Sequence, residues 1–200
     1  MATIPGGSYD IDFGTHKGDV LFHADGNWIA FGLKGNDVMI GGDGTDIMFG
    51  GDGKDTLVGN DGFNLLFGDK GDDVLIGGDS GNFLDGSKGK DTLIGGASDD
   101  ILIGGEGKDT LYGGDGNDTF VFTSGGGRDI VMDFQEGDVL EIQRNINGLR
   151  IHDAEDLLCR IHNDHDGNAV IDLGRGDSIT LVNVSAEDIH SDPDSFIRIH

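Results

Sequence analysis

The sequence predicts an all-β fold: a right-handed coil of short parallel strands with about six turns, followed by a β-rich capping segment with short helices. The first observation behind this prediction is composition. Glycine contributes 38 of the 200 residues and proline only 2, which fits neither collagen nor a flexible linker. The second is a nine-residue period that runs from Gly14 to Val121 without an insertion. Glycine at fixed intervals indicates tight turns with backbone angles that other residues avoid.

Within the twelve repeats, the sixth and eighth places carry the strongest constraints. The sixth place is aspartate in nine units and reads Asp19, Trp28, Asp37, Asp46, Asp55, Asn64, Asp73, Asn82, Asp91, Asp100, Asp109 and Asp118. The eighth place is apolar throughout and reads Leu21, Ala30, Met39, Met48, Leu57, Leu66, Leu75, Leu84, Leu93, Leu102, Leu111 and Phe120. Only the middle side chain of a three-residue strand points inward, so the eighth-place residues form the predicted core.

A repeat with a single inward residue cannot bury a core by itself, so neighbouring repeats must stack. Two repeats are expected to make one turn of a flattened right-handed coil, with parallel strands about 4.8 Å apart. Each repeat n then lies over repeat n+2, and the odd-numbered and even-numbered repeats form two separate rows of loops.

Four repeats carry a recognisable pattern: GGDGTDIMF (41–49), GGDGKDTLV (50–58), GGEGKDTLY (104–112) and GGDGNDTFV (113–121). They resemble the nonapeptide of the RTX (repeats-in-toxin) proteins. The resemblance implies the parallel β-roll of that family, with calcium ions between the loops of repeats n and n+2. Calcium prefers six to eight hard oxygen ligands, and we expect about six to ten ions. Zinc fits less well, because histidine and cysteine are absent from the repeated places.

The resemblance assigns calcium ligands to the sixth-place side chains and to the backbone carbonyls of the glycine-rich loops. The candidate side chains are Asp19, Asp37, Asp46, Asp55, Asn64, Asp73, Asn82, Asp91, Asp100, Asp109, Asp118 and, beyond the repeats, Asp129. The candidate glycines, at the second and fourth places, are Gly35, Gly42, Gly44, Gly51, Gly53, Gly62, Gly71, Gly89, Gly105, Gly107, Gly114 and Gly116.

The two rows differ in charge. The odd row has aspartate on both sides of every gap between stacked loops, although its first loop lacks the fourth-place glycine. The even row begins with Trp28 and has Asn64 facing Asn82. Because an amide supplies one neutral oxygen, we expect the gap between Asn64 and Asn82 to be the weakest calcium site. Two alternatives stay open: Asp61 and Asp79 at the third place compensate, or carbonyls dominate and the site still fills.

The even-numbered strands also carry an apolar stripe on their outward places. Its members are Ile29, Phe31, Ile47, Phe49, Leu65, Phe67 and Phe83. Such a stripe indicates cover by another part of the chain, with dimerisation and ligand binding as the alternatives. Trp28 is expected to belong to an N-terminal cap rather than to a sugar-binding platform.

The period breaks after residue 121, which divides the chain into an N-terminal cap with the roll (1–121) and a C-terminal segment for capping and secretion (122–200). The stretch 124–134 is expected to form one last calcium loop. In it Asp129 takes the sixth place after a slip of two residues and faces Asp109.

Beyond this loop we expect a strand, a short helix capped by Asp153, a hairpin over residues 169–184 and a capped turn that begins at Ser185. The sequence GRGDS (174–178) matches an integrin-binding tripeptide, but glycines at a hairpin turn explain it. The single Cys159 lies among apolar residues and is expected to be a buried structural thiol.

The C-terminal segment resembles the one that closes the roll in serralysin-type proteases, including SITLVNVSAEDI (178–189) and the acidic-then-apolar tail DPDSFIRIH (192–200). The resemblance implies recognition by a type I secretion machinery. The tail departs from the family pattern because it ends in Arg198 and His200.

The net charge of −25 disfavours nucleic acid and anionic membranes as partners and favours cations. No apolar stretch approaches the roughly 18 residues of a membrane span. The start of the sequence has neither the basic flank nor the apolar stretch of a signal peptide. We therefore expect an extracellular protein that is secreted without an N-terminal signal peptide.

No HExxH, GxSxG or catalytic cysteine signature occurs, so we expect the chain not to be an enzyme in its own right. The expected function is a calcium-binding roll that folds outside the cell. It would serve as the folding and secretion module of a larger enzyme such as a protease, lipase or alginate epimerase. The alternative is a stand-alone calcium-dependent protein that binds polysaccharide or the cell surface. Ice binding is disfavoured because the fifth place is irregular.

Overall fold

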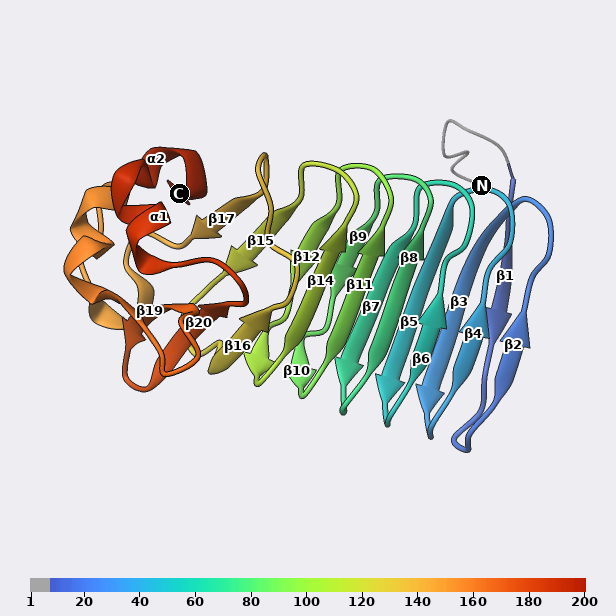
Figure 1. The fold of residues 1–200 in the computed structure, drawn as a ribbon. Coiled ribbons are helices and arrows are strands. Elements are labelled where there is room, and N and C mark those ends of the chain that lie inside the picture. The colour runs from blue at the N-terminus through green and yellow to red at the C-terminus, as the bar shows by residue number, and fades with distance from the viewer. Residues whose placement is uncertain (1–7) are drawn as a thin grey trace.

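The computed structural model describes residues 8–200, so residues 1–7 of the expected N-terminal cap lie outside the described residues. The chain winds as a coil whose strands alternate between two sheets (Figure 1). The strands advance from the N-terminus at one end of the molecule to the helices at the other. The coil has about seven turns, and the predicted parallel β-roll is confirmed.

The first sheet contains the strands of the even-numbered repeats and their extensions. Its main path is β1 (Tyr9–Phe13), β3 (Asn27–Lys34), β5 (Asp46–Asp52), β7 (Leu65–Lys70), β9 (Phe83–Asp85), β12 (Ile101–Ile103), β15 (Thr119–Phe122), β17 (Val139–Ile142) and β21 (Ile197–Ile199). The two-residue strands β10 (Lys88–Gly89) and β13 (Glu106–Gly107) pair with each other beside this path.

The second sheet contains the strands of the odd-numbered repeats and ends in a hairpin. Its members are β2 (Val20–Phe22), β4 (Val38–Ile40), β6 (Thr56–Val58), β8 (Val74–Gly78), β11 (Thr92–Gly96), β14 (Thr110–Gly114), β16 (Arg128–Val131), β20 (Asp177–Leu181), β19 (Ala169–Gly174) and β18 (Ile161–Asn163). All pairs are parallel except β20 with β19 and β19 with β18.

The register confirms the predicted stacking of repeats n and n+2. Each eighth-place residue pairs with the eighth-place residue two repeats later, as in Leu57 with Leu75 and Leu66 with Leu84. The coil also extends beyond the repeats. Strand β1 pairs in the same phase with β3, and β16, β17, β20 and β21 continue both sheets after the period breaks. These strands account for the turn in excess of the six expected.

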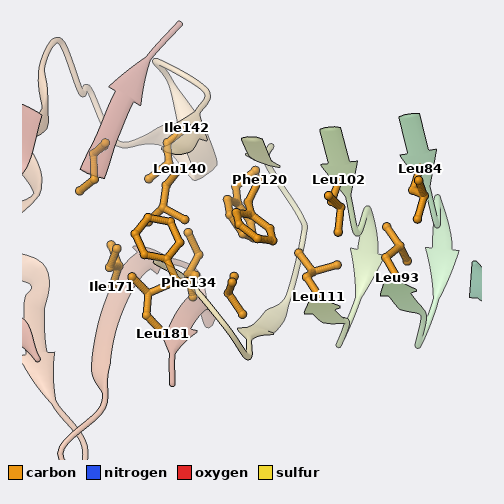
Figure 2. Close-up of a cluster of buried hydrophobic side chains, with 14 of the residues drawn as sticks. Leu84, Leu93, Leu102, Leu111, Phe120, Phe134, Leu140, Ile142, Ile171 and Leu181 are labelled. Carbon is orange, nitrogen blue, oxygen red and sulfur yellow. The ribbon is translucent and has the colours of Figure 1, made fainter. Parts of the chain in front are cut away.

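The predicted core is confirmed along the repeats. The eighth-place residues from Ala30 to Phe120 are fully buried between the sheets, and only Leu21 in the first repeat is partly exposed. Figure 2 shows Leu84 and Leu102 of one sheet facing Leu93 and Leu111 of the other. At the C-terminal end the same core widens to include Phe134, Leu140, Ile142, Ile171 and Leu181.

The C-terminal segment forms the predicted elements. The helices are η1 (Ile146–Gly148), η2 (Ala154–Arg160), α1 (Ala186–Ser191) and α2 (Pro193–Phe196). Asp153 caps η2, since its carboxylate accepts a hydrogen bond from Asp156 N. Ser185 begins a complete capping box with Asp188, so the expected capped turn is a short helix.

The predictions for GRGDS (174–178) and for Cys159 have different outcomes. The GRGDS stretch forms the turn between β19 and β20, where the Asp177 carboxylate accepts hydrogen bonds from Asn147 Nδ2 at 2.8 Å and Gly125 N at 3.1 Å. The expected burial of Cys159 is wrong, because the thiol is free and exposed. It lies on the solvent side of η2, whose buried residues are Ala154 and Leu157.

The phenylalanines of the apolar stripe, together with Phe13 of β1, form a ladder of rings on the outer face of the first sheet. Phe13, Phe31, Phe49 and Phe67 stack with centroids 5.0, 5.1 and 4.9 Å apart, and Phe83 follows at 5.7 Å. The helices of residues 8–200 pack at the C-terminal end, against β17, β18, β19, β21 and one another. They therefore do not supply the intrachain cover expected for this stripe.

Candidate metal sites

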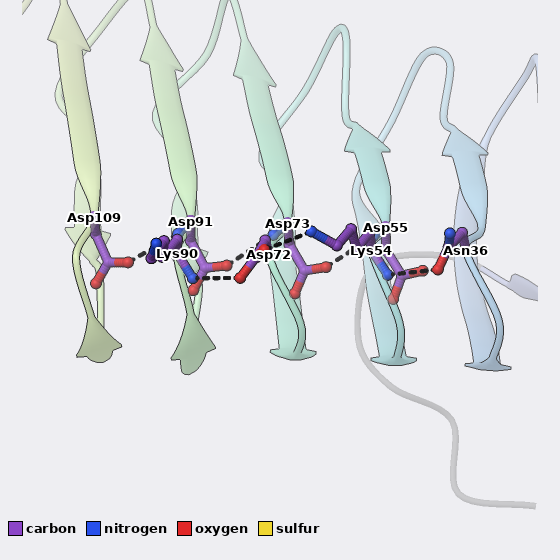
Figure 3. A network of polar contacts seen from close by, with 8 residues as sticks. All are labelled: Asn36, Lys54, Asp55, Asp72, Asp73, Lys90, Asp91 and Asp109. Atoms are coloured by element: carbon purple, nitrogen blue, oxygen red, sulfur yellow. Dashed lines mark hydrogen bonds and ion pairs between the residues drawn. The ribbon is translucent and has the colours of Figure 1, made fainter.

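The sixth-place aspartates lie buried in two lines between successive loops. In the odd row from Asp37 onward, one oxygen of each carboxylate accepts a hydrogen bond from the backbone N–H of the sixth-place residue one turn earlier. Asp37 N donates to Asp55 Oδ1 at 2.7 Å, and Asp55 N donates to Asp73 Oδ1 at 2.7 Å. Figure 3 shows the carboxylates of Asp55, Asp73, Asp91 and Asp109 pointing along the row, with the exposed Lys54–Asp72 ion pair beside them. The bonds explain how the stacking fixes each side chain.

One oxygen of these carboxylates has no hydrogen-bond donor: it is Oδ2 in seven aspartates and Oδ1 in Asp46, whose Oδ2 accepts from Gly42 N at 3.3 Å. Such a buried, unpartnered oxygen occurs in eight aspartates: Asp37, Asp46, Asp55, Asp73, Asp91, Asp100, Asp109 and Asp118. In Asp55 this oxygen points toward a space bordered by backbone: a Cβ built on Gly50 would lie 2.6 Å from Asp55 Oδ2 and 2.8 Å from the carbonyl oxygen of Gly68. A buried carboxylate oxygen beside carbonyl oxygens is strongly unfavourable unless a cation compensates it. This oxygen-only set fits calcium.

Burial raises the pKa of these carboxyl groups. Removal from water is the main cause of the raised pKa of Asp73, to about 7, and of Asp91, to about 8. Neighbouring carboxylates in the row add repulsion, as between Asp73 and Asp55. The pKa of Asp129 is raised to about 8, again mainly by burial. The loops therefore disfavour the ionised form of these carboxyl groups unless a cation is bound there.

Acid is accordingly expected to promote folding of the metal-depleted chain. The ordinary pKa of aspartate is 3.8, and burial raises that of Asp91 to about 8 and that of Asp100 to about 7 in the coil. The folded chain then binds protons that the unfolded chain does not, so stability rises as the pH falls from about 8 to about 4. Far-ultraviolet circular dichroism of metal-depleted protein across this range should show increasing β-structure. A flat or decreasing β signal would contradict the expectation.

The loop glycines allow the close stacking of turns. All the candidate glycines except Gly42 have positive φ. Gly71, with φ 144°, has its α-carbon so close to the turn before it that a Cβ would overlap the carbonyl oxygen of Gly53. Only glycine combines this backbone angle with this approach, and the loop carbonyls are thereby brought next to the carboxylates.

Besides Asp46 and Trp28, three sixth-place positions depart from this arrangement. Asp19 is only half-buried, and its Oδ2 accepts hydrogen bonds from Thr15 N at 2.6 Å and Thr15 Oγ1 at 2.9 Å. Asn64 and Asn82 are buried, and their amide nitrogens donate to loop carbonyls. In all three, the atom equivalent to the unpartnered oxygen already has a protein partner. Asp19 also stands in the loop that lacks the fourth-place glycine.

Trp28 closes the N-terminal end of the even row. Its ring is fully buried, its Nε1 donates to Asp12 Oδ2 at 3.0 Å, and it stacks on His23 with ring centroids 5.7 Å apart. A buried ring cannot present a platform to sugars, so Trp28 acts as an end cover of the row.

The structure adds residues to both rows after the repeats. Asp109 N donates to Asp129 Oδ1 at 3.0 Å, so Asp129 occupies the predicted place in the odd row. In the even row, Asp118 N donates to Asp138 Oδ1 at 2.9 Å, a position that the sequence interpretation missed. Its signal was the pattern Asp138-Val-Leu140, with the same slip of two residues as Asp129.

Within residues 8–200, no three acidic, histidine or cysteine side chains converge on one point as a metal-binding cluster. The unpartnered oxygen of Asp55 borders the same space as the carbonyl oxygen of Gly68, so a cation in these loops would combine carboxylate with backbone carbonyl ligands. This ligand balance suits calcium and is unlike a structural zinc site.

The fold and these loops together define a parallel β-solenoid with rows of buried acidic side chains. The chain belongs to the RTX calcium-binding nonapeptide repeat family, whose model matches residues 24–57, 49–84, 58–93, 85–120 and 94–131. Together these matches cover more than half of the chain. No curated protein sequence matches it. In residues 8–200, no helix has the length and apolar character needed to cross a membrane.

One similar solved structure is the extracellular lipase LipA from Serratia marcescens, with a TM-score of 0.51 and 20% sequence identity. The similarity covers 98% of this chain and 41% of the lipase chain. The chain therefore corresponds to less than half the length of that lipase, and the likeness concerns the fold.

Proposed function

We infer that this chain is a calcium-gated folding module that forms its coil on binding several calcium ions outside the cell. The observation that carries the inference is the set of eight buried carboxylate oxygens without donors, arranged in two rows. The ions would be held by these aspartates and by carbonyls of the neighbouring glycine-rich loops. Calcium would supply the positive charge that the buried carboxylates lack.

The energetics support control by calcium. The net charge of −25 opposes compaction when cations are scarce. At ten times its dissociation constant, each ion contributes about 1.4 kcal/mol to the folded state. Six such ions contribute about 8 kcal/mol, which is comparable to the stability of an entire domain. Calcium is therefore expected to decide whether the coil forms.

Circular dichroism tests this function directly. In chelator at neutral pH, the far-ultraviolet spectrum should lack most of the β signal, and addition of calcium should restore it. Magnesium at the same concentration serves as the control, because its smaller, rigid coordination shell suits these carbonyl-rich loops less well. A β signal that is the same in chelator and in calcium would refute calcium-gated folding.

The proposed context is a larger secreted protein. The likeness to the lipase covers less than half of that chain, which supports a role beside a separate catalytic part. The acidic-then-apolar C-terminal tail (192–200) supports export by a type I secretion machinery. Intact mass of the natural secreted protein tests this context: a value well above 21.0 kDa supports it, and a value equal to that of this chain contradicts it.

One observation favours the alternative of a stand-alone polysaccharide-binding or cell-surface protein. Phe13, at one end of the stacked phenylalanines on the outer face of the first sheet, is 64% exposed. Dimerisation through this face is the other use that an apolar stripe supports. Sedimentation in calcium with and without soluble polysaccharide distinguishes a dimer from a complex with the sugar.

A further inference from the structure

Asn64 and Asn82 occupy the same place in their loops as the aspartates, but they present a different atom to the same surroundings. In Asp55, the free oxygen faces Gly50 of its own repeat and the carbonyl of Gly68, the first residue of repeat n+2. In Asn64, Nδ2 faces Gly59 and the carbonyl of Gly77, which are the equivalent positions. The aspartate oxygen and the asparagine nitrogen therefore point into equivalent spaces.

The orientation of both amides is set by the stacking hydrogen bond. Asp46 N donates to Asn64 Oδ1 at 3.1 Å, and Asn64 N donates to Asn82 Oδ1 at 3.1 Å. A backbone N–H requires an acceptor, so the oxygen must lie on this side. The NH₂ group is then directed to the loop carbonyls.

The NH₂ of Asn64 has carbonyl partners from two repeats. Its Nδ2 donates to Gly62 O at 3.1 Å, and it lies 3.4 Å from both Asn60 O and Gly77 O. Gly62 is one of the glycines expected to ligate calcium. A donor group thus binds the carbonyls that a cation would otherwise bind.

Asn82 repeats this pattern one turn later. Its Nδ2 donates to Ser80 O of its own loop and lies 3.5 Å from Gly95 O in repeat n+2. Unlike the eight aspartates, neither asparagine leaves a buried side-chain polar atom unpartnered. The third-place Asp61 and Asp79, which could have compensated for the missing charge, are exposed.

We propose that the side-chain amides of Asn64 and Asn82 replace bound calcium in the middle of the even row. This inference rests on the proposed calcium-binding function. The two loops are closed by protein hydrogen bonds and exclude the ion, because an NH₂ group occupies the space and no carboxylate offsets the charge of calcium. The coil therefore contains one calcium-independent segment within a calcium-dependent structure.

Counting bound calcium in matched variants tests this proposal. Asn64→Asp/Asn82→Asp restores two carboxylates to the even row. Asp55→Asn/Asp73→Asn makes the mirror change in the same turns of the odd row. Equilibrium dialysis against calcium should show more bound ions in the first variant than in the wild type, and fewer in the second. An Asn64→Asp/Asn82→Asp variant that folds in calcium but binds no additional ion would overturn the proposal.

A second measurement does not require the first variant to fold. In chelator, Asp55→Asn/Asp73→Asn should retain more β signal than the wild type, because its amides close two more loops without metal. The control is Asp61→Asn/Asp79→Asn, which removes the same two charges at exposed positions of the even-row loops. If both pairs of substitutions have equal effects in chelator, loss of charge alone is responsible and the amide role is wrong.

Different results would contradict the calcium-binding function and the replacement of calcium by amides. If the wild type binds no calcium and Asp55→Asn/Asp73→Asn changes nothing, the proposed function itself is wrong. If the wild type binds calcium and loses it in that variant, while Asn64→Asp/Asn82→Asp folds and gains none, only the amide replacement is wrong.

Discussion

Gly71→Ala is expected to prevent normal stacking of the coil even in saturating calcium. Gly71 has φ 144°, and an added Cβ would overlap the carbonyl oxygen of Gly53, which belongs to backbone that cannot rotate away. The positive φ alone costs about 1–3 kcal/mol, and the overlap forces two turns apart. We expect a loss of at least about 4 kcal/mol in the free energy of unfolding, measured by urea denaturation in calcium.

Gly167→Ala is the matched control for this change. Gly167 also has positive φ, 90°, but a Cβ there would meet no atom within 4 Å. It therefore carries the backbone strain without the overlap, and about 1–2 kcal/mol is expected. Equal losses in the two variants would show that the close approach of the turns is not what requires glycine at position 71.

Leu102→Ala is expected to produce the other large effect. Leu102 is fully buried between the sheets, and it is the single buried residue of its three-residue strand. Its truncation therefore leaves a cavity that no other side chain of the strand can fill. The expected loss is about 2–5 kcal/mol. Because calcium binding is coupled to folding, the calcium concentration at half-maximal β signal should also rise.

Ile101→Ala provides the control. Ile101 precedes Leu102 on the same three-residue strand, but it is 42% exposed. A loss below about 1 kcal/mol is expected there. If the two alanine variants were equally destabilised, the inward line of eighth-place residues would not be the main source of apolar stabilisation.

Much of the fold follows from the period alone. The eighth-place apolar residues and the stacking of repeats n and n+2 were predictable because a nine-residue unit with tight glycine turns allows one inward position and one neighbour. Asp129 could also be placed, since it retains the spacing to a following strand after a slip of two residues. Asp138, the corresponding residue of the even row, has the same slip but lies in a stretch without loop glycines at the usual places, so it was missed.

Other features depended on packing that no local pattern encodes. Cys159 stands in an apolar stretch, yet η2 turns it toward solvent because only Ala154 and Leu157 of that helix face the core. Strand β1 joins the first sheet in phase with the repeats, although its residues lack the repeat's glycines. The phenylalanine ladder was expected to be covered by another part of the chain, but the helices of residues 8–200 lie elsewhere and its rings stack on one another.

The sequence alone specifies that this chain is an RTX roll with two rows of sixth-place residues, and that one row is poorer in carboxylates. Only the tertiary structure decides which side-chain atom faces the loop carbonyls. The physical reason is that in Asn64, and in aspartates such as Asp73, one side-chain oxygen accepts a hydrogen bond from a backbone N–H one turn away. The remaining atom then meets carbonyls of two repeats: an oxygen in Asp73, which needs a cation, and a donor NH₂ in Asn64, which does not.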